Sequence, residues 1–534
     1  MNRAIKVILF MVMLLTMATL ACRDRAVDYN NRGLAKFNKG DLDGAITDYN
    51  KAIELKPDFA IAYGNRGLAK FNKGDLDGAI TDCTKAIELK PHFAIAYDNR
   101  GLAELNNGDF EDAITDYNKA IKLKPDFAIA YGNRGLAKFN KGDLDGAITD
   151  YNKAIELKPD LAIAYGNRGL AKNDKGDLVG AITDCTKAIE LDPNDAKAYG
   201  NRGLAKYNKG NLDGAITDYN KAIELKPDFA NAYGNRGVAK NDKGDLDGAI
   251  TDYTKAIGLD PNDAKTYSNR GFAKYNKGDF EGAITDYNKA TELKPDFAIA
   301  YDNRGLAKND KGDLDGAITD YTKAIELDPN EAKAYSNRGV AKFNKGNLDG
   351  AITDYNKAIG LDPNDAEAYS NRGFAKYNKG NLDGAITDYN KAIELKPDFA
   401  IAYGNRGLAK NDKGDLDGAI TDYNKAIGLD PNDAEAQSNR GLAKYNKGDF
   451  EGAITDYNKA IELKPDFAIA YENRGLAKFN KGDLDGAITD YNKAIELDPN
   501  DAEAYSNRGA AKQAKGDSVG ANTDNKKATE LNGK

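Results

Sequence analysis

Residues 60–93 read AIAYGNRGLAKFNKGDLDGAITDCTKAIELKPHF and contain the signals from which the fold can be predicted. Two runs of apolar residues spaced three and four apart flank Gly74 and Asp75, which predicts two amphipathic helices joined by a tight turn. Gly74 suits the left-handed residue that closes a first helix, and Asp75 is a favourable N-cap for a second. Pro91 disfavours helical geometry at Lys90 and ends the second helix. The stretch is therefore predicted to form a helical hairpin.

The same stretch recurs along the chain. All 14 prolines lie 34 residues apart, from Pro57 to Pro499, and they divide the chain into fifteen repeats that begin at residue 26. We number positions within a repeat from residue 26 and its equivalents, so that proline is at position 32. A single hairpin cannot bury its apolar faces without a neighbour, so the period predicts an all-α stack of hairpins.

The composition argues against catalysis. The 534 residues include no Trp, three Cys and one His (His92). A catalytic site that uses histidine would have to use His92, and a metal site with several histidines cannot form within the chain. Carboxylate pairs recur in every repeat, whereas an active site is formed at one place in a chain. The recurring Asp-Leu-Asp-Gly is part of an EF-hand pattern, but that alignment puts Lys39 and Asn50 at ligand positions. We expect no enzymatic activity, no cofactor and no metal.

The N-terminal segment predicts export. Residues 1–22 contain Arg3 and Lys6 followed by a 15-residue apolar run, which is the length of a signal peptide and short for a spanning helix. The ending Thr-Leu-Ala-Cys resembles a bacterial lipobox, which implies acylation of Cys22 and attachment to the membrane on the extracytoplasmic side of the cell envelope. Ordinary cleavage after Ala21, giving a secreted or periplasmic product, and an uncleaved anchor are the alternatives. Residues 23–25 would form a short tether.

Residues 26–534 resemble the tetratricopeptide repeat (TPR) family. The resemblance implies a right-handed α-solenoid, or superhelix, of fifteen tandem 34-residue helix-turn-helix units. It also implies a concave groove, lined mainly by the first helices, that holds a protein or peptide ligand. The first repeat supplies the residues of the family signature: Tyr29, Gly33, Ala45, Tyr49, Ala52 and Pro57.

Charged residues depart from the family pattern at two positions. Position 7 is Arg and position 23 is Asp in all fifteen repeats, and the hairpin geometry puts them opposite each other, so we predict an Arg–Asp pair in each repeat. An arginine stripe that binds an anionic polymer is the alternative. Lysines at positions 11 and 14, such as Lys36 and Lys39, are expected to form a solvated face. The net charge of −8, lowered to −10 by removing residues 1–22, opposes nucleic-acid binding.

The family resemblance directs positions 2, 5, 6, 9, 12 and 13 toward the groove. Position 6 is always Asn, whose amide can bond either to the backbone of an extended peptide or to a neighbouring helix; both interpretations stay open. The candidate groove residues are Asn31, Asn65, Asn99, Asn133 and Asn167, with Ile61, Ile95 and Ile129 at position 2 and Phe71 and Phe139 at position 12.

Position 2 changes character along the chain. It is apolar in repeats 1–5, mostly Lys or Asn in repeats 6–10, and alternates between Glu and Ile in repeats 11–15. One hypothesis is that the membrane-near repeats hold an apolar peptide segment and later repeats a mixed-charge segment; drift after duplication is the alternative. The whole pattern predicts a non-catalytic scaffold for protein partners, with a structural spacer or a cell-wall glycan-binding protein as alternatives.

Two further features concern the ends and the cysteines. Residues 26–501 form repeats 1–14, whereas residues 502–534 form a degenerate repeat whose polar final helix is expected to cap the array. Cys83 and Cys185 replace an aromatic at position 24 three repeats apart, which is too far for a disulfide, and are predicted to be buried. The polar replacements in the final helix are Ser518, Asn522, Asn525 and Thr529.

Overall fold

A computed structural model describes residue 8, residues 11–12 and residues 25–533. The described chain contains α-helices and no strand, and it forms two compact units, residues 1–273 and 274–534, which we describe separately. Cys22 and the predicted cleavage site lie outside the described residues. No helix among the described residues is both long and apolar enough to cross a bilayer.

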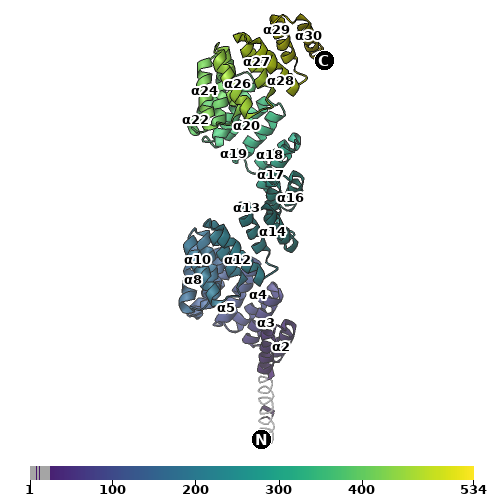
Figure 1. Ribbon diagram of the computed structural model, residues 1–534. Helices are drawn as coiled ribbons and strands as arrows, with labels where there is room; N and C mark the ends of the chain where they lie inside the picture. The colour runs from purple at the N-terminus through teal and green to yellow at the C-terminus, as the bar shows by residue number, and fades with distance from the viewer. Residues whose placement is uncertain (1–7, 9–10, 13–24, 534) are drawn as a thin grey trace. The chain divides into compact units, whose positions relative to one another are not determined.

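In the first unit, helical residues 25–38 and α2 (Leu42–Leu55) form the hairpin of repeat 1, and further hairpins follow in chain order (Figure 1). Each first helix packs against its own second helix and against the second helix of the preceding repeat. The remaining helices are α3 (Ala60–Lys73), α4 (Leu76–Leu89), α5 (Ala94–Asn107), α6 (Phe110–Leu123), α7 (Ala128–Asn140), α8 (Leu144–Leu157), α9 (Ala162–Asp174), α10 (Leu178–Leu191), α11 (Ala196–Asn208), α12 (Leu212–Leu225), α13 (Ala230–Asp242), α14 (Leu246–Leu259) and α15 (Ala264–Asn276), in which the boundary falls.

The second unit repeats the same arrangement of first and second helices. Its helices are α16 (Phe280–Leu293), α17 (Ala298–Asp310), α18 (Leu314–Leu327), α19 (Ala332–Asn344), α20 (Leu348–Leu361), α21 (Ala366–Asn378), α22 (Leu382–Leu395), α23 (Ala400–Asp412), α24 (Leu416–Leu429), α25 (Ala434–Asn446), α26 (Phe450–Leu463), α27 (Ala468–Lys481), α28 (Leu484–Leu497), α29 (Ala502–Ala514) and α30 (Ser518–Asn532).

The turn inside each hairpin has the predicted chemistry. Gly74 adopts a φ of 89°, a left-handed conformation that is strained for any residue with a Cβ, so glycine ends α3. The side chain of Asp75 then accepts a hydrogen bond of 2.9 Å from the backbone N–H of Gly78 and caps α4. Lys90, before the proline, has an extended φ of −142° and ends that helix. The hairpin predicted for residues 60–93 is confirmed.

Two kinds of junction join successive repeats. In six of them an acid at position 34 caps the next helix, as Asp195 does by accepting from the backbone N–H groups of Lys197 and Ala198. The other junctions carry Phe or Leu at position 34 and a Lys at position 31. There the helix start has no side-chain cap, as at Phe93, whose ring packs near Gly64 instead. The residue at position 34 therefore decides whether the next first helix begins with a side-chain cap or with an uncapped Phe or Leu.

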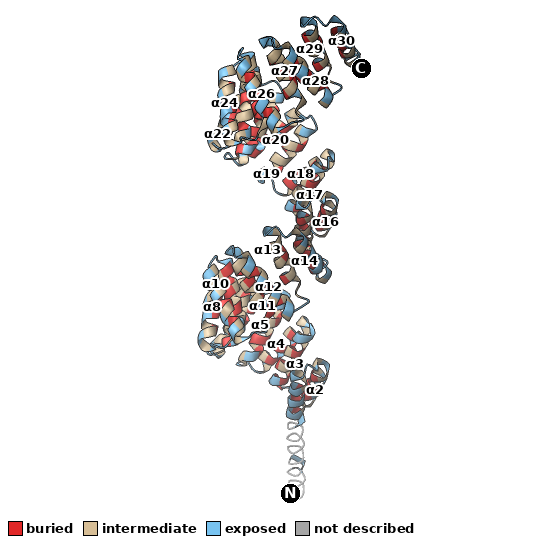
Figure 2. Cartoon of the chain, viewed as in Figure 1, coloured by how far each residue is buried: buried red, intermediate tan, exposed pale blue. Residues whose placement is uncertain are grey.

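The core consists of small residues and one aromatic per repeat. A Cβ on Gly33 would lie 2.7 Å from Cε1 of Tyr49, so glycine at position 8 allows the aromatic at position 24 to sit between the two helices. Tyr49 packs against Ala45 and against Ala69 of the next repeat. Buried residues gather where helices meet and exposed ones on the outer surfaces (Figure 2). The core of each repeat is thus completed by its neighbour, as predicted.

The cysteines and the final helix match their predicted environments. Cys83 and Cys185 are fully buried and unpaired at the aromatic position. Burial raises the pKa of each thiol to about 12. The four polar replacements in α30 are all exposed: Ser518, Asn522, Asn525 and Thr529.

Candidate peptide-binding surface

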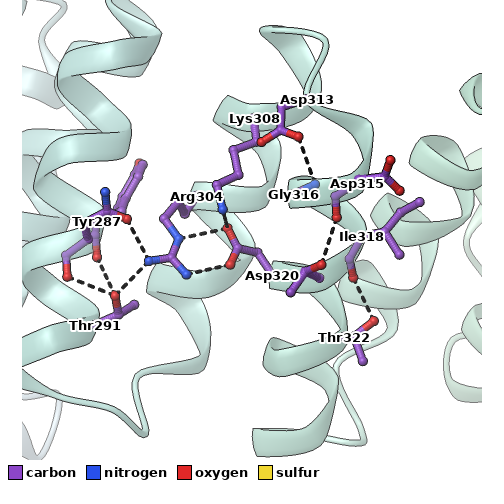
Figure 3. A network of polar contacts seen from close by, with 12 residues as sticks. Tyr287, Thr291, Arg304, Lys308, Asp313, Asp315, Gly316, Ile318, Asp320 and Thr322 are labelled. Atoms are coloured by element: carbon purple, nitrogen blue, oxygen red, sulfur yellow. Dashed lines mark hydrogen bonds and ion pairs between the residues drawn. The ribbon is translucent and has the colours of Figure 1, made fainter.

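The predicted Arg–Asp pair is present in every repeat that lies within one unit. In repeat 9, Arg304 donates from Nε and Nη2 to the two oxygens of Asp320, at 2.8 and 2.5 Å (Figure 3). The equivalent Nε to Oδ2 distances in the other such repeats are 2.6–2.9 Å. These guanidinium groups are already neutralised, so an arginine stripe is not free to bind an anionic polymer.

The lysine at position 11 joins this pair, and here the solvated-face prediction is wrong. Lys308 Nζ lies 2.7 Å from Asp320 Oδ2, and its side chain is mostly buried (Figure 3). Lys36 likewise contacts Asp48. The buried carboxylate thus has two cations, because a single guanidinium leaves one of its lone-pair sites open. The lysine at position 14 is exposed as expected, and Lys73 pairs with Asp43 of the preceding repeat.

The arginine also joins neighbouring repeats. Arg66 Nη1 donates to Asn50 Oδ1 of the preceding repeat at 2.6 Å, and Thr takes the place of Asn in some repeats, as in the bond from Arg100 to Thr84. Arg32 has no preceding repeat among the described residues, and its side chain is 57% exposed. One side chain therefore closes the hairpin and fixes the register between hairpins.

Repeat 3 lacks this balance of charges. Glu104 stands at position 11, and its Oε2 is buried with no hydrogen-bond partner. Burial, together with the charge of Asp116, raises the pKa of Glu104 to about 7, and Arg100 opposes the rise. In the same repeat, burial raises the pKa of Asp98 to about 6, against the hydrogen bond that Asn133 donates. Glu104 thus stands where the other repeats have the second cation of the Arg–Lys–Asp contact.

The first helices present an apolar row at position 2. Ile61, Ile95 and Ile129 are 40%, 47% and 49% exposed, although isoleucine is usually buried. They lie on successive first helices of the first unit, and neighbouring first helices such as α3 and α5 contact each other. The predicted groove face therefore carries exposed apolar side chains at regular intervals, which is typical of a binding surface.

The asparagines at position 6 contact the neighbouring repeat in several places. Asn65 donates to Oδ1 of Asn30 at 3.0 Å and Asn133 to Oδ1 of Asp98 at 3.1 Å, while Asn99 donates to the carbonyl of Gly64 at 3.4 Å. These three asparagines therefore bond to a neighbouring helix, which is one of the two interpretations that the sequence left open. Peptide binding stays a prediction for the whole set, which includes the exposed Asn31 and the half-buried Asn167.

The two predicted aromatics at position 12 are half-buried. Phe139 packs against the core cluster of Ala147, Tyr151 and Ala171, so part of its ring stabilises the stack. Phe71 occupies the equivalent place in α3. Their remaining exposed surface is the part that a ligand can contact.

Cavities open between neighbouring first helices. One of about 210 Å³ lies against α13 and is lined by Asn231, Gly234, Asn235 and Val238, among others, which are positions 2, 5, 6 and 9. A second, of about 380 Å³, lies between α21 and α23 at the same positions. The face that these positions line therefore contains hollows between neighbouring first helices. Among the described residues, no three or more His, Cys, Asp or Glu side chains group to hold a metal.

Models of one repeat family match most of the chain. The model described as TPR repeat matches residues 33–74 and overlapping stretches from 169 to 516, and two tetratricopeptide repeat models match residues 99–162 and 60–93. The chain belongs to the tetratricopeptide repeat family. The TPR assignment inferred from the residues at positions 4, 8, 20, 24, 27 and 32 is confirmed, and so is the all-α architecture of tandem hairpins.

The TPR chain is similar to several solved structures. A crystal structure of the APC/C hetero-tetramer Cut9-Hcn1 contains a chain with 16% identity and a TM-score of 0.44, over 93% of this chain and 98% of that chain. MamA has 33% identity and a TM-score of 0.30, over 32% and 92%. YrrB, a TPR protein with an unusual peptide-binding site, has 26% identity and a TM-score of 0.29, over 34% and 95%. No curated protein matches the chain.

The sequence missed two parts of this surface. It did not predict that lysine at position 11 would be buried beside an Asp, although Lys recurs at position 11 in fourteen repeats, together with Arg at position 7 and Asp at position 23. It also did not predict the contacts between position 12 of one repeat and position 13 of the next, such as Tyr207 Oη donating to Asp242 Oδ2 at 2.5 Å. These contacts depend on the distance between repeats, which no local pattern encodes.

Proposed function

We propose that the protein is a non-catalytic scaffold that binds protein or peptide partners along the face formed by its first helices. The observation that carries the proposal is the row of exposed isoleucines at position 2, beside asparagines and hollows between neighbouring first helices. Membership of the TPR family supports it, because such repeats bind protein partners. A structural spacer would have no use for a recurring exposed isoleucine, which adds an aggregation risk.

The test replaces Ile61, Ile95 and Ile129 together with Glu. Partners are first identified by crosslinking mass spectrometry on the membrane fraction, and each is then bound to the purified array in a direct assay. A loss of at least tenfold in affinity supports the proposal. The control is Val179→Glu, which changes an even more exposed apolar residue (62%) on the second helix α10.

Unchanged affinity of every partner for the triple variant would contradict binding at this face. If no partner is retained at all, the spacer alternative is favoured. Co-sedimentation with purified peptidoglycan tests the third alternative, a glycan-binding protein. Glycan binding would replace the proposed peptide binding only if the array sediments with peptidoglycan and the triple variant does not.

We further propose that the scaffold is exported and lipid-anchored through Cys22 at a bacterial cell envelope. The basic residues, the short apolar run and the terminal Thr-Leu-Ala-Cys support this proposal. Metabolic labelling with palmitate tests it, with Cys22→Ala as the control. Label in the wild type alone supports the anchor, whereas an unlabelled product shortened at Ala21 would indicate ordinary secretion.

A further inference from the structure

The cavity between α21 and α23 combines apolar walls with one free carboxylate. Its volume is about 380 Å³, and Phe374, Phe399 and Ile401 supply apolar surface. Glu367 stands beside them, is exposed and makes no ion pair with any described residue. The remaining lining residues are Ser370, Asn371 and Asn405.

This combination matches the shape and charge of a long basic side chain. Lys and Arg bury an aliphatic stem against apolar surface while the charged end reaches a carboxylate. Lys396 Nζ lies 4.9 Å from the ring centroid of Phe399, so that ring already holds a cation, and an incoming cation is attracted by Glu367 instead. Phe374 is held in place by Phe343, at a centroid distance of 5.3 Å, so the wall is preformed.

Further along the same pair of helices lies a second exposed carboxylate. Asp412 accepts a hydrogen bond from Tyr377 Oη at 2.5 Å, so that Tyr377 orients it. Glu367 and Asp412 therefore both present negative charge along this seam.

The other cavity of the second unit differs at these positions. The cavity beside α17 and α19 is smaller, about 180 Å³; Ile299 stands there at the position of Glu367, and Lys333 stands at the position of Ile401. Its carboxylates come from Asp302, Asp328 and Glu331 instead. Glu367 therefore places a carboxylate at position 2 of the first helix of the pair, where the α17/α19 cavity has an apolar side chain.

We propose that the α21/α23 seam binds a Lys or Arg side chain of an extended segment of a partner protein, with the cation at Glu367. This rests on the proposed function, since it names the partner chemistry for one part of the same face. The occupant is a basic polypeptide segment, because only a long cation fills the apolar walls and meets the carboxylate together.

The test measures binding of three fluorescein-labelled dodecapeptides to the full array by fluorescence anisotropy. The probes alternate Leu with Lys, with Glu or with Gln. We expect the Lys peptide to bind at least tenfold tighter than the other two. Glu367→Lys should weaken the Lys peptide at least tenfold and strengthen the Glu peptide, a gain that a misfolded variant could not show.

The control is Glu394→Lys, the same charge change on the second helix α22 of the same repeat, where Glu394 is exposed and pairs only with Lys391. It should change the affinity of the Lys peptide less than twofold. Equal loss in the two variants would mean general attraction to an acidic protein and would overturn the site. Equal binding of all three peptides, or of none, would also overturn it, while the isoleucine test in the first unit judges the proposed function independently.

Discussion

In repeat 3, Glu104 Oε1 lies 3.6 Å from Arg100 Nε, in a position where the other fourteen repeats have lysine. Arg100 already donates to both oxygens of Asp116, so one guanidinium serves two carboxylates. The side chain of Glu104 is only 12% exposed, and water cannot replace the missing cation fully. This repeat is therefore the electrostatic weak point of the first unit.

Replacing Glu104 with Lys should stabilise repeat 3. The new ammonium group would take the place that Lys138 occupies beside Asp150 in repeat 4. We expect a gain of about 1–3 kcal/mol in local opening free energy, because the change removes a buried like-charge contact and supplies a pair. Hydrogen exchange of α5 and α6 measures it. Slower exchange in those helices is required, and unchanged or faster exchange would contradict the interpretation.

The wild-type repeat should lose stability as the pH rises toward neutrality. The folded protein raises the pKa of Glu104 from its ordinary 4.5 to about 7 through burial and Asp116, so the folded state binds the proton more tightly than the unfolded state. The stabilisation is complete below about pH 4.5 and is lost as the pH passes 7. Asp109 and Asp112 face the same group and add to the effect.

Hydrogen exchange of α5 and α6 between pH 5 and 8, corrected for intrinsic rates, measures this dependence. Glu104→Gln is the control, because it keeps the shape and removes the titration at this position. The wild type should show a steeper fall in local stability than this variant. Parallel profiles would show that Glu104 does not titrate in this range.

Removing an arginine from position 7 should open the stack locally. Arg406 donates to both oxygens of the buried Asp422 and to Asn390 of the preceding repeat at 2.7 Å. Arg406→Ala leaves that carboxylate with Lys410 alone, and we expect a cost of about 3–5 kcal/mol in the opening of α22 to α24. Lys447→Ala, which breaks an exposed pair with Asp417, should cost less than about 1 kcal/mol. Similar costs for the two variants would refute a structural role for the buried pair.

The two buried thiols should resist modification. Cys83 and Cys185 have no exposed surface, and their raised pKa of about 12 leaves almost no thiolate at pH 8. In a Cys22→Ser background, a disulfide reagent should label neither thiol in the native state and both after denaturation. Val179→Cys adds an exposed thiol as a positive control and should react at once. Prompt labelling of Cys83 would show that repeat 2 opens readily.

Much of the fold could be predicted because its determinants are local. Gly74, Asp75 and Pro91 act within a few residues of their own position, and the period of 34 repeats those signals along the chain. The Arg–Asp pair was also predictable, since two positions that never vary face each other across one turn. The candidate surface was predicted less completely. The place of Ile61 on the groove face was implied by the family resemblance, but the partner of Asn65 depends on how closely two repeats approach.

Local sequence signals are enough to give the number of hairpins, where each begins and ends, and which small residues allow the helices to meet. The hydrogen bonds and ion pairs that polar groups form inside the stack follow only from the packing of the helices. This packing buried Lys308 beside Asp320, turned Asn133 toward Asp98, and left Glu367 free beside an apolar cavity. The physical reason is that caps and turns depend on neighbouring residues, whereas burial and pairing depend on distances between helices 34 residues apart in the chain.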